Sequence, residues 1–160
     1  MRRIIISLLL LALAAAAAAA QDGRQLLGRI EQAAREREPD WSVTSKSAHE
    51  TTLLITFASN QPPADAPKVL VTAEIAKSIQ KAKSRFREAC RAGAAAARRA
   101  KGEGIELKDL GEEACSYQSL LPGLKGLTFR GGKVNVHIDA SSWEAARRFA
   151  DLIAASLAAP

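Results

Sequence analysis

The sequence is poor in the residue types from which catalytic, metal and nucleic-acid sites are built. Its 160 residues include two His, two Cys, one Tyr, two Trp and four Phe. Proteins that bind single-stranded nucleic acid stack bases on aromatic side chains, and the aromatics here fall mostly at core-facing positions. Enzymes hold groups of tuned acidity within hydrogen-bonding distance, and these histidines and the scattered acids form no motif. The sequence therefore assigns no catalytic, metal or cofactor-binding residue and predicts no nucleic-acid partner.

The two cysteines, Cys90 and Cys115, lack the C-x-x-C spacing that is typical of a thiol redox site. In an exported chain, an even pair of this kind predicts a disulfide. Closing a loop of about 25 residues would stabilise the fold by roughly 3 kcal/mol in the chain-entropy model. Two buried free thiols are the alternative.

The start of the chain has the pattern of a secretory leader. Positive charge at positions 2 and 3 precedes an apolar run over residues 4–13, which passes into alanine over residues 14–20. Ala18 and Ala20 provide the small-x-small pattern of signal peptidase before Gln21. We expect residues 1–20 to be a cleaved signal peptide and the protein to be exported to the periplasm or the exterior.

An uncleaved membrane anchor is the alternative, but eight of the 20 leader residues are alanine, which partitions weakly into hydrocarbon. No later segment is apolar enough to span a bilayer, so no transmembrane anchor is expected after cleavage. The remaining residues 21–160 carry 21 Lys and Arg against 17 Asp and Glu, a net charge of +4. Their number predicts a single domain with a genuine core.

The first half of the mature chain predicts one helix and up to three strands. Helical spacing of apolar residues covers 25–38, and strands over 41–47 and 52–57 are expected to pair as a hairpin. In the first strand, Trp41, Val43, Ser45 and Ser47 are expected on one side, with Ser42, Thr44 and Lys46 on the other. Residues 69–75 fit a third strand or, alternatively, a helix that begins at Thr72.

The second half begins with a long helix over about 76–101, in which Ala92–Ala97 reads as a tightly docked or solvent-tolerant final part. Strands follow over 114–119, 127–130 and 134–138, with Gly131 and Gly132 as the hairpin turn between the last two. A helix capped by Ser141 or Ser142 ends the chain. The prediction is an α+β fold of order α-βββ-α-βββ-α, with an antiparallel sheet of about five to six strands and helices packed mainly on a single apolar face.

The carboxyl-terminal segment 127–157, LTFRGGKVNVHIDASSWEAARRFADLIAASL, resembles the last hairpin and helix of many uncharacterised exported bacterial proteins. The resemblance rests on Phe129, Arg130, Gly132 and the alternating valines. Lys133 stands where those proteins usually have asparagine. The resemblance covers about a fifth of the chain and implies a sheet with flanking helices, with no active site to carry over.

His137 is the best-placed histidine for a binding or metal role, on the polar face of its strand with Lys133, Asn135 and Asp139. Such a role requires His49 or an acid to meet it in space, and a solvated sheet face is the alternative. Glu112 and Glu113 are interpreted as a pair in sequence only, because adjacent strand residues point to opposite sides.

The long helix is the most basic element. Its cations are Lys77, Lys81, Lys83, Arg85, Arg87, Arg91, Arg98, Arg99 and Lys101, against Glu88. Of these, Lys77, Lys81, Arg85 and Arg91 are, with His137, the weak binding candidates. The alternative is an ordinary solvated helix face.

Three functions follow from these patterns. The leading hypothesis is a non-enzymatic exported accessory or binding domain, whose partner would be another envelope protein or an anionic surface. The second is a hydrolase or metal-dependent enzyme whose site is assembled only in the fold. The third is binding of an anionic envelope or lipid surface through the basic helix 77–101. A deep pocket that holds His137 would favour the enzyme, and a flat sheet face beside the basic helix would favour binding.

Overall fold

The elements of the chain follow one another in the order predicted from the sequence. The computed structural model describes residues 22–60, 67–100, 107, 109–119, 121 and 123–158. The first described element is a helix over residues 22–37. It is followed by β1 (Trp41–His49), β2 (Thr52–Ser59), β3 (Lys68–Ile75), α2 (Ile79–Ala100), β4 (Glu113–Gln118), β5 (Lys125–Gly131), β6 (Val134–Ala140) and α3 (Trp143–Ala158). The predicted α+β class and element order are confirmed, and residues 69–75 belong to a strand.

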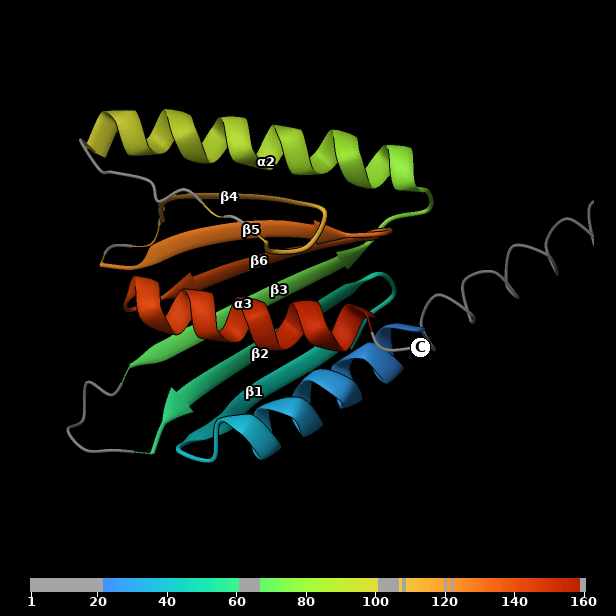
Figure 1. The fold of residues 1–160 in the computed structure, drawn as a ribbon, viewed down its shortest axis with the longest axis vertical. Coiled ribbons are helices and arrows are strands. Elements are labelled where there is room, and N and C mark those ends of the chain that lie inside the picture. Colours follow the sequence, from blue (N-terminus) through green and yellow to red (C-terminus); the bar gives the residue numbers. More distant parts are fainter. Residues whose placement is uncertain are drawn as a thin grey trace, which may run out of the picture.

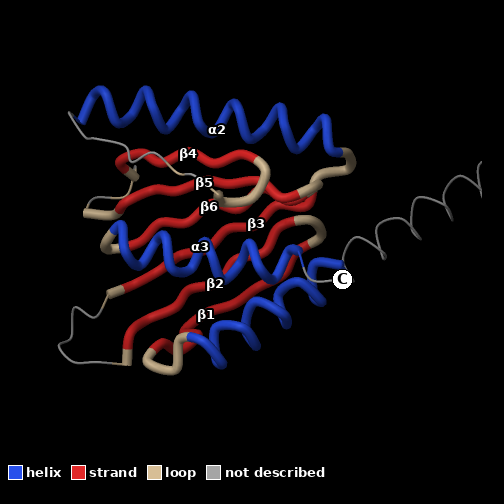
Figure 2. Tube along the Cα trace, in the orientation of Figure 1, coloured by secondary structure: helices blue, strands red, loops and turns tan. Residues whose placement is uncertain are grey.

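The six strands form one antiparallel sheet in the spatial order β1-β2-β3-β6-β5-β4. Strands β1 to β3 form one meander and β4 to β6 form a second, and the two meanders join where β3 pairs with β6 (Figure 1, Figure 2). The expected hairpin of the first two strands is confirmed by the pairing of β1 with β2. This order places β6, with His137, in the middle of the sheet.

The helix of residues 22–37 and α3 lie on one face of the sheet, which we call the first face (Figure 1). Phe149 of α3 contacts Phe57 of β2, with ring centroids 4.7 Å apart, and Trp41 of β1, with centroids 5.1 Å apart. The alternating apolar residues of β2, β3, β5 and β6 are buried on this face. Each large apolar side chain buried there stabilises the fold by about 1.5–3 kcal/mol, so the main core lies here.

The remaining helix, α2, contacts β4, β5 and β6 from the opposite face, which we call the second face. Cys90 of α2 and Cys115 of β4 form a disulfide, with their Cα atoms 6.0 Å apart, so the predicted bridge between helix and sheet is confirmed. Two helices share the first face as expected, but α2 does not join them. It packs on the second face because Tyr117 of β4, 6% exposed, offers apolar surface there.

A β-bulge in β1 changes the predicted sides of that strand. The register with β2 shifts between Val43 and Ser45, so Ser45 lies opposite Thr56 and Lys46 lies opposite Ile55. The prediction that Ser45 shares a side with Trp41 is therefore wrong, since the extra residue reverses the alternation beyond the bulge. Lys46 reaches the first face, where its Nζ lies 2.7 Å from Glu31 of the 22–37 helix.

The second face of β1, β2 and β3 lies largely outside the contacts of α2. Leu54 in the middle of β2 is 49% exposed, and its neighbours Thr56, Leu70 and Thr72 are half-buried. The described residues therefore leave a mostly polar sheet surface beside α2.

The turn between β5 and β6 is one residue later than the sequence predicts. Gly131 is the last residue of β5, and the turn consists of Gly132 and Lys133. Gly132 has a φ of 57°, which glycine adopts without steric cost. The turn places the Lys133 side chain at one end of the sheet, next to the amino end of α2, since Ala76 donates a backbone hydrogen bond to the Lys133 carbonyl.

Candidate functional site

His137 belongs to a hydrogen-bonded group on the second face, which we call the polar cluster: Ser119, Tyr117, Thr128, His137 and Asp139. His137 Nδ1 lies 2.6 Å from the Tyr117 hydroxyl and 2.9 Å from the Thr128 hydroxyl. His137 Nε2 lies 3.0 Å from Asp139 Oδ2. The cross-strand register explains this meeting, because Tyr117 and Asp139 both lie beside Gly126, and Thr128 lies beside His137.

The contacts of His137 determine which ring nitrogen donates a hydrogen bond and which accepts one. Because a carboxylate only accepts hydrogen bonds, Nε2 carries a proton and donates it to Asp139. In the neutral ring Nδ1 then accepts from the Tyr117 hydroxyl. Both ring nitrogens of His137 therefore contact neighbouring side chains of the polar cluster, and the side chain that donates to Nδ1 is the buried Tyr117.

The pKa values of the two ionisable partners of His137 are shifted in opposite directions. Burial opposes ionisation of Asp139, but hydrogen bonds from His137 and Ser119 outweigh it and lower the pKa of the Asp139 carboxyl. Burial raises the pKa of the Tyr117 hydroxyl, and the nearby Asp139 charge adds to this effect. Tyr117 therefore stays protonated and serves as a donor, whereas an activated nucleophile needs a lowered pKa.

An acid, Asp139, meets His137 as the binding or metal role requires, but His49 does not. Ser119 Oγ donates to Asp139 Oδ1 at 2.5 Å, so the serine is joined to the acid and the histidine lies on the acid's other oxygen. His49 lies at the end of β1, separated from β6 by β2 and β3. Within the described residues, no three His, Cys, Asp or Glu side chains are grouped as metal ligands would be.

A second polar group surrounds Arg130, which is 1% exposed. Its Nε donates to Glu113 at 2.8 Å, and its Nη2 donates to Glu112 at 2.6 Å. The interpretation of Glu112 and Glu113 as a pair in sequence only is therefore wrong. Glu112 precedes β4, so strand alternation does not govern its direction, and both carboxylates meet at one guanidinium.

The pKa values of this group follow from its contacts. A hydrogen bond from the Gly132 amide, followed by the bond from Arg130, lowers the pKa of Glu112. Burial opposes the charge of Arg130, but hydrogen bonds to Glu113 and Glu112 outweigh it and raise the pKa of the guanidinium. The group therefore places one buried guanidinium between two carboxylates.

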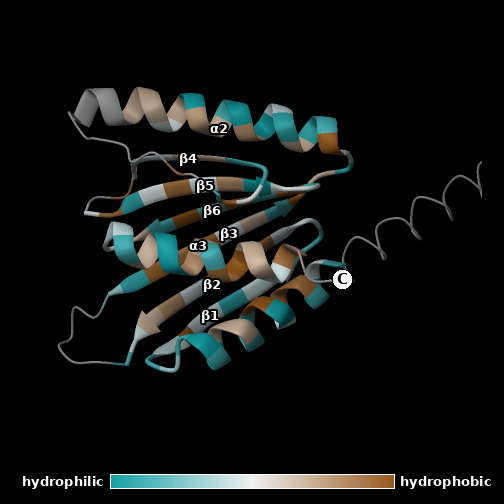
Figure 3. Cartoon of the chain, viewed as in Figure 1, coloured by the Kyte–Doolittle hydropathy of each residue, from teal (hydrophilic) through white to brown (hydrophobic). Residues whose placement is uncertain are grey.

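The basic residues of α2 divide into two sets. Arg85 is turned toward the sheet, where it forms an ion pair with Glu74 of β3. Lys83, Arg87 and Arg91 instead line a surface hollow of about 720 Å³ together with Gln80, Ser84 and Glu88. We call this hollow the basic hollow. Figure 3 shows the corresponding length of α2 in mainly hydrophilic colours.

The four predicted candidates on the helix are therefore not equivalent. Arg91 lines the basic hollow, Arg85 is engaged with the sheet, and Lys77 and Lys81 are exposed at the amino end of the helix. Lys77 precedes the first residue of α2, which begins at Ile79. From the sequence, Lys83 and Arg87 are counted among the cations of the helix but are not grouped with Arg91. The spacing of Lys83, Arg87 and Arg91 at i, i+4 and i+8 already indicates that the three lie on one side of the helix.

Close packing holds α2 in place below the basic hollow. Besides the Cys90–Cys115 disulfide, Gly93 is buried against the ring of Tyr117, where a Cβ would overlap that ring. The docked interpretation of the alanine-rich part is confirmed at this position. The cations of α2 are therefore carried on a helix that the sheet keeps in a fixed position.

Several predicted residues lie outside the described part of the chain: Ala18, Ala20, Gln21, Lys101 and the side chains of Arg98 and Arg99. Among the described helices, none combines the length and apolar composition that a membrane span requires. The disulfide is compatible with an exported protein.

The fold and these sites define a class: an α+β protein in which a disulfide-anchored basic helix lies beside a mostly polar sheet surface. No protein-family model, curated protein or solved structure matches the chain.

Proposed function

We propose that this chain is a non-enzymatic binding domain, exported to the periplasm or the exterior, that attaches to an anionic lipid surface through the basic hollow of α2. The observation that carries the proposal is the meeting of Lys83, Arg87 and Arg91 in one hollow.

The charge of the basic hollow supports an anionic partner. Its six lining residues include three cations and one acid, Glu88. Successive cations are four residues apart, about 6 Å along the helix axis, so they form a short row of positive charge on one side of α2. Basic residues at the surface of an anionic membrane each contribute about 1 kcal/mol to binding.

The second face of the sheet favours attachment to a surface over catalysis. The only histidine near α2 in the described residues, His137, has both ring nitrogens engaged by Tyr117, Thr128 and Asp139. The adjoining surface of β1 to β3 is open and mostly polar. A polar sheet beside a basic helix suits attachment to a surface, and a hydrolytic site would need a free base in a recess.

Co-sedimentation with vesicles tests the proposal. Wild-type protein should bind vesicles that contain phosphatidylglycerol and should not bind vesicles of phosphatidylcholine alone. The double substitution Arg87→Gln/Arg91→Gln should weaken binding about 30-fold, because two contributions of about 1 kcal/mol are removed.

The matched control is Arg24→Gln/Arg35→Gln, which removes the same charge from the helix on the first face. This variant should bind as the wild type does. Equal losses in the two variants would show a response to net charge alone and contradict a site on α2, as would binding to neutral vesicles.

A further inference from the structure

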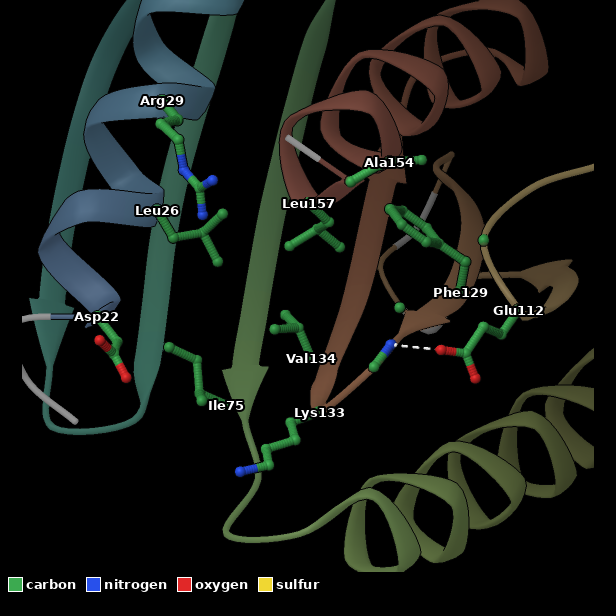
Figure 4. Close-up of a pocket in the computed structure, with 14 residues that line it drawn as sticks. Asp22, Leu26, Arg29, Ile75, Glu112, Phe129, Lys133, Val134, Ala154 and Leu157 are labelled. Atoms are coloured by element: carbon green, nitrogen blue, oxygen red, sulfur yellow. Dashed lines mark hydrogen bonds between the residues drawn. The ribbon is translucent and has the colours of Figure 1, made fainter. Parts of the chain in front are cut away.

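A groove with apolar walls lies on the first face, at the end of the sheet that carries the β5–β6 turn (Figure 4). We call it the end groove. Its volume is about 670 Å³, within the range of roughly 300–1,000 Å³ that is typical of sites for small ligands. The apolar residues that line it are Leu26, Ile75, Phe129, Val134, Ala154 and Leu157. They come from the 22–37 helix, β3, β5, β6 and α3.

Glu112 and Lys133, two charged residues that line the end groove, differ in whether their side chains are already paired. Both oxygens of Glu112 are occupied, Oε1 by the Gly132 amide at 2.8 Å and Oε2 by Arg130 at 2.6 Å. Lys133 is exposed, and within the described residues its Nζ makes no ion pair. Asp22 lies on the opposite wall, at the start of the helix (Figure 4). The groove therefore offers one uncommitted cation on the side of the β5–β6 turn.

Figure 4 shows how these groups face the groove. The Lys133 side chain extends from the turn toward the side that carries Ile75, and the Arg29 guanidinium is directed into the space beside Leu26 and Leu157. A ligand that fills the groove would thus meet apolar carbon along its length and positive charge beside it.

We propose that the end groove binds a free fatty acid, with its acyl chain along the half-buried Ile75, Val134 and Leu157 and its carboxylate at Lys133. The apolar walls suit a hydrocarbon chain, and one uncommitted ammonium group matches one carboxylate. This site is separate from the basic hollow, which lies on the second face, and it does not depend on the function proposed for α2.

Displacement of a fluorescent fatty acid tests the site. The probe is 11-(dansylamino)undecanoic acid, bound to the protein purified after export, and the competitors are dodecanoate, dodecanol and dodecyltrimethylammonium below their micelle-forming concentrations. Dodecanoate should displace the probe most effectively and the cationic chain least. Equal displacement by all three would contradict recognition of the carboxylate.

Two substitutions separate the chain from its headgroup. Lys133→Gln should weaken dodecanoate binding about fivefold, the upper range for an exposed ion pair, and leave dodecanol unchanged. Ala154→Phe, at a half-buried position in the wall, should fill the groove and weaken both competitors more than tenfold. A circular dichroism spectrum and thermal midpoint like those of the wild type verify that Ala154→Phe is folded.

Lys81→Gln on α2 is the matched control for Lys133→Gln and should leave probe affinity unchanged. The α2 variant Arg87→Gln/Arg91→Gln should also retain the probe, so failure of the fatty-acid site and failure of the vesicle-binding function are distinguishable. Unchanged displacement in both groove variants would overturn the proposal. Tighter binding of lysophosphatidylglycerol than of dodecanoate would overturn the assignment to a free acid.

Discussion

Single residues in this molecule owe their roles to partners on other strands. Arg130 is 1% exposed and binds Glu112, Glu113 and the Gly132 carbonyl. Removing one partner from a buried ionic group is costly because the remaining charge loses its compensation. Asp139 has a similar dependence on His137 and Ser119.

Asp139 should make the stability of the fold sensitive to acid. Its pKa is lower in the folded chain than in the unfolded chain, so the unfolded chain binds more protons in this range. The stabilisation is complete above the ordinary aspartate pKa of 3.8 and is lost as the pH falls through the lower folded value. Asp139→Asn should remove this acid-dependent part of the free energy of unfolding.

Denaturant unfolding of the wild type and Asp139→Asn between pH 2 and pH 6 measures this effect. The difference between the two proteins should shrink as the medium becomes more acidic. The exposed substitution Asp40→Asn is the control. A difference that stayed constant with pH would show that the Asp139 carboxylate does not contribute through its charge.

Two helices each contain a glycine, and the surroundings of the two glycines differ. In α2, Gly93 allows the backbone to approach Tyr117, and Tyr117 in turn lies over Gly126 of β5. In the 22–37 helix, Gly28 has open space where a Cβ would lie. The two glycines therefore occupy helices for different reasons.

Alanine at these two positions should have opposite effects on stability. Gly28→Ala should stabilise the protein by about 0.8–1 kcal/mol through helix propensity. Gly93→Ala has the same propensity gain but should destabilise the protein, because its Cβ would overlap the Tyr117 ring. Midpoints of chemical unfolding for the two variants test the close approach, and a stabilising Gly93→Ala would contradict it.

Element order was predictable because helical and strand periodicities differ, and the GGK segment marked the last hairpin. The face of the sheet on which α2 packs was not predictable. The apolar stripe of the helix indicates that one side of it is buried, but it does not indicate against which face of the sheet. The β1 bulge was also hidden, because Val43 to Ser45 continues a plausible alternation. His137 was singled out from its strand face, whereas Tyr117 and Ser119 joined it through strand pairing that the sequence does not encode locally.

At the scale of the whole molecule, the two faces of the sheet carry different features. The first face carries the main core and the end groove. The second face carries the disulfide, the polar cluster and the basic hollow. If the proposed function is correct, a lipid surface would contact the second face, and the main core lies on the opposite face.

Export of the molecule is a separate prediction from the leader. Mass spectrometry of the protein recovered from the periplasm or medium of a bacterial host should show a chain that begins at or near Gln21. The expected cause is cleavage after Ala20 by signal peptidase. An exported chain that retained Met1 would contradict cleavage.

The salt dependence of vesicle binding tests the proposed function most directly. Exposed charges are screened within about 10 Å at 0.1 M salt and about 3 Å at 1 M, so the affinity of the wild type for phosphatidylglycerol vesicles should fall steeply between these concentrations. Arg87→Gln/Arg91→Gln should show a weaker dependence, because fewer cations of the basic hollow contribute. Binding that is indifferent to salt in the wild type would contradict attachment through the charges of α2.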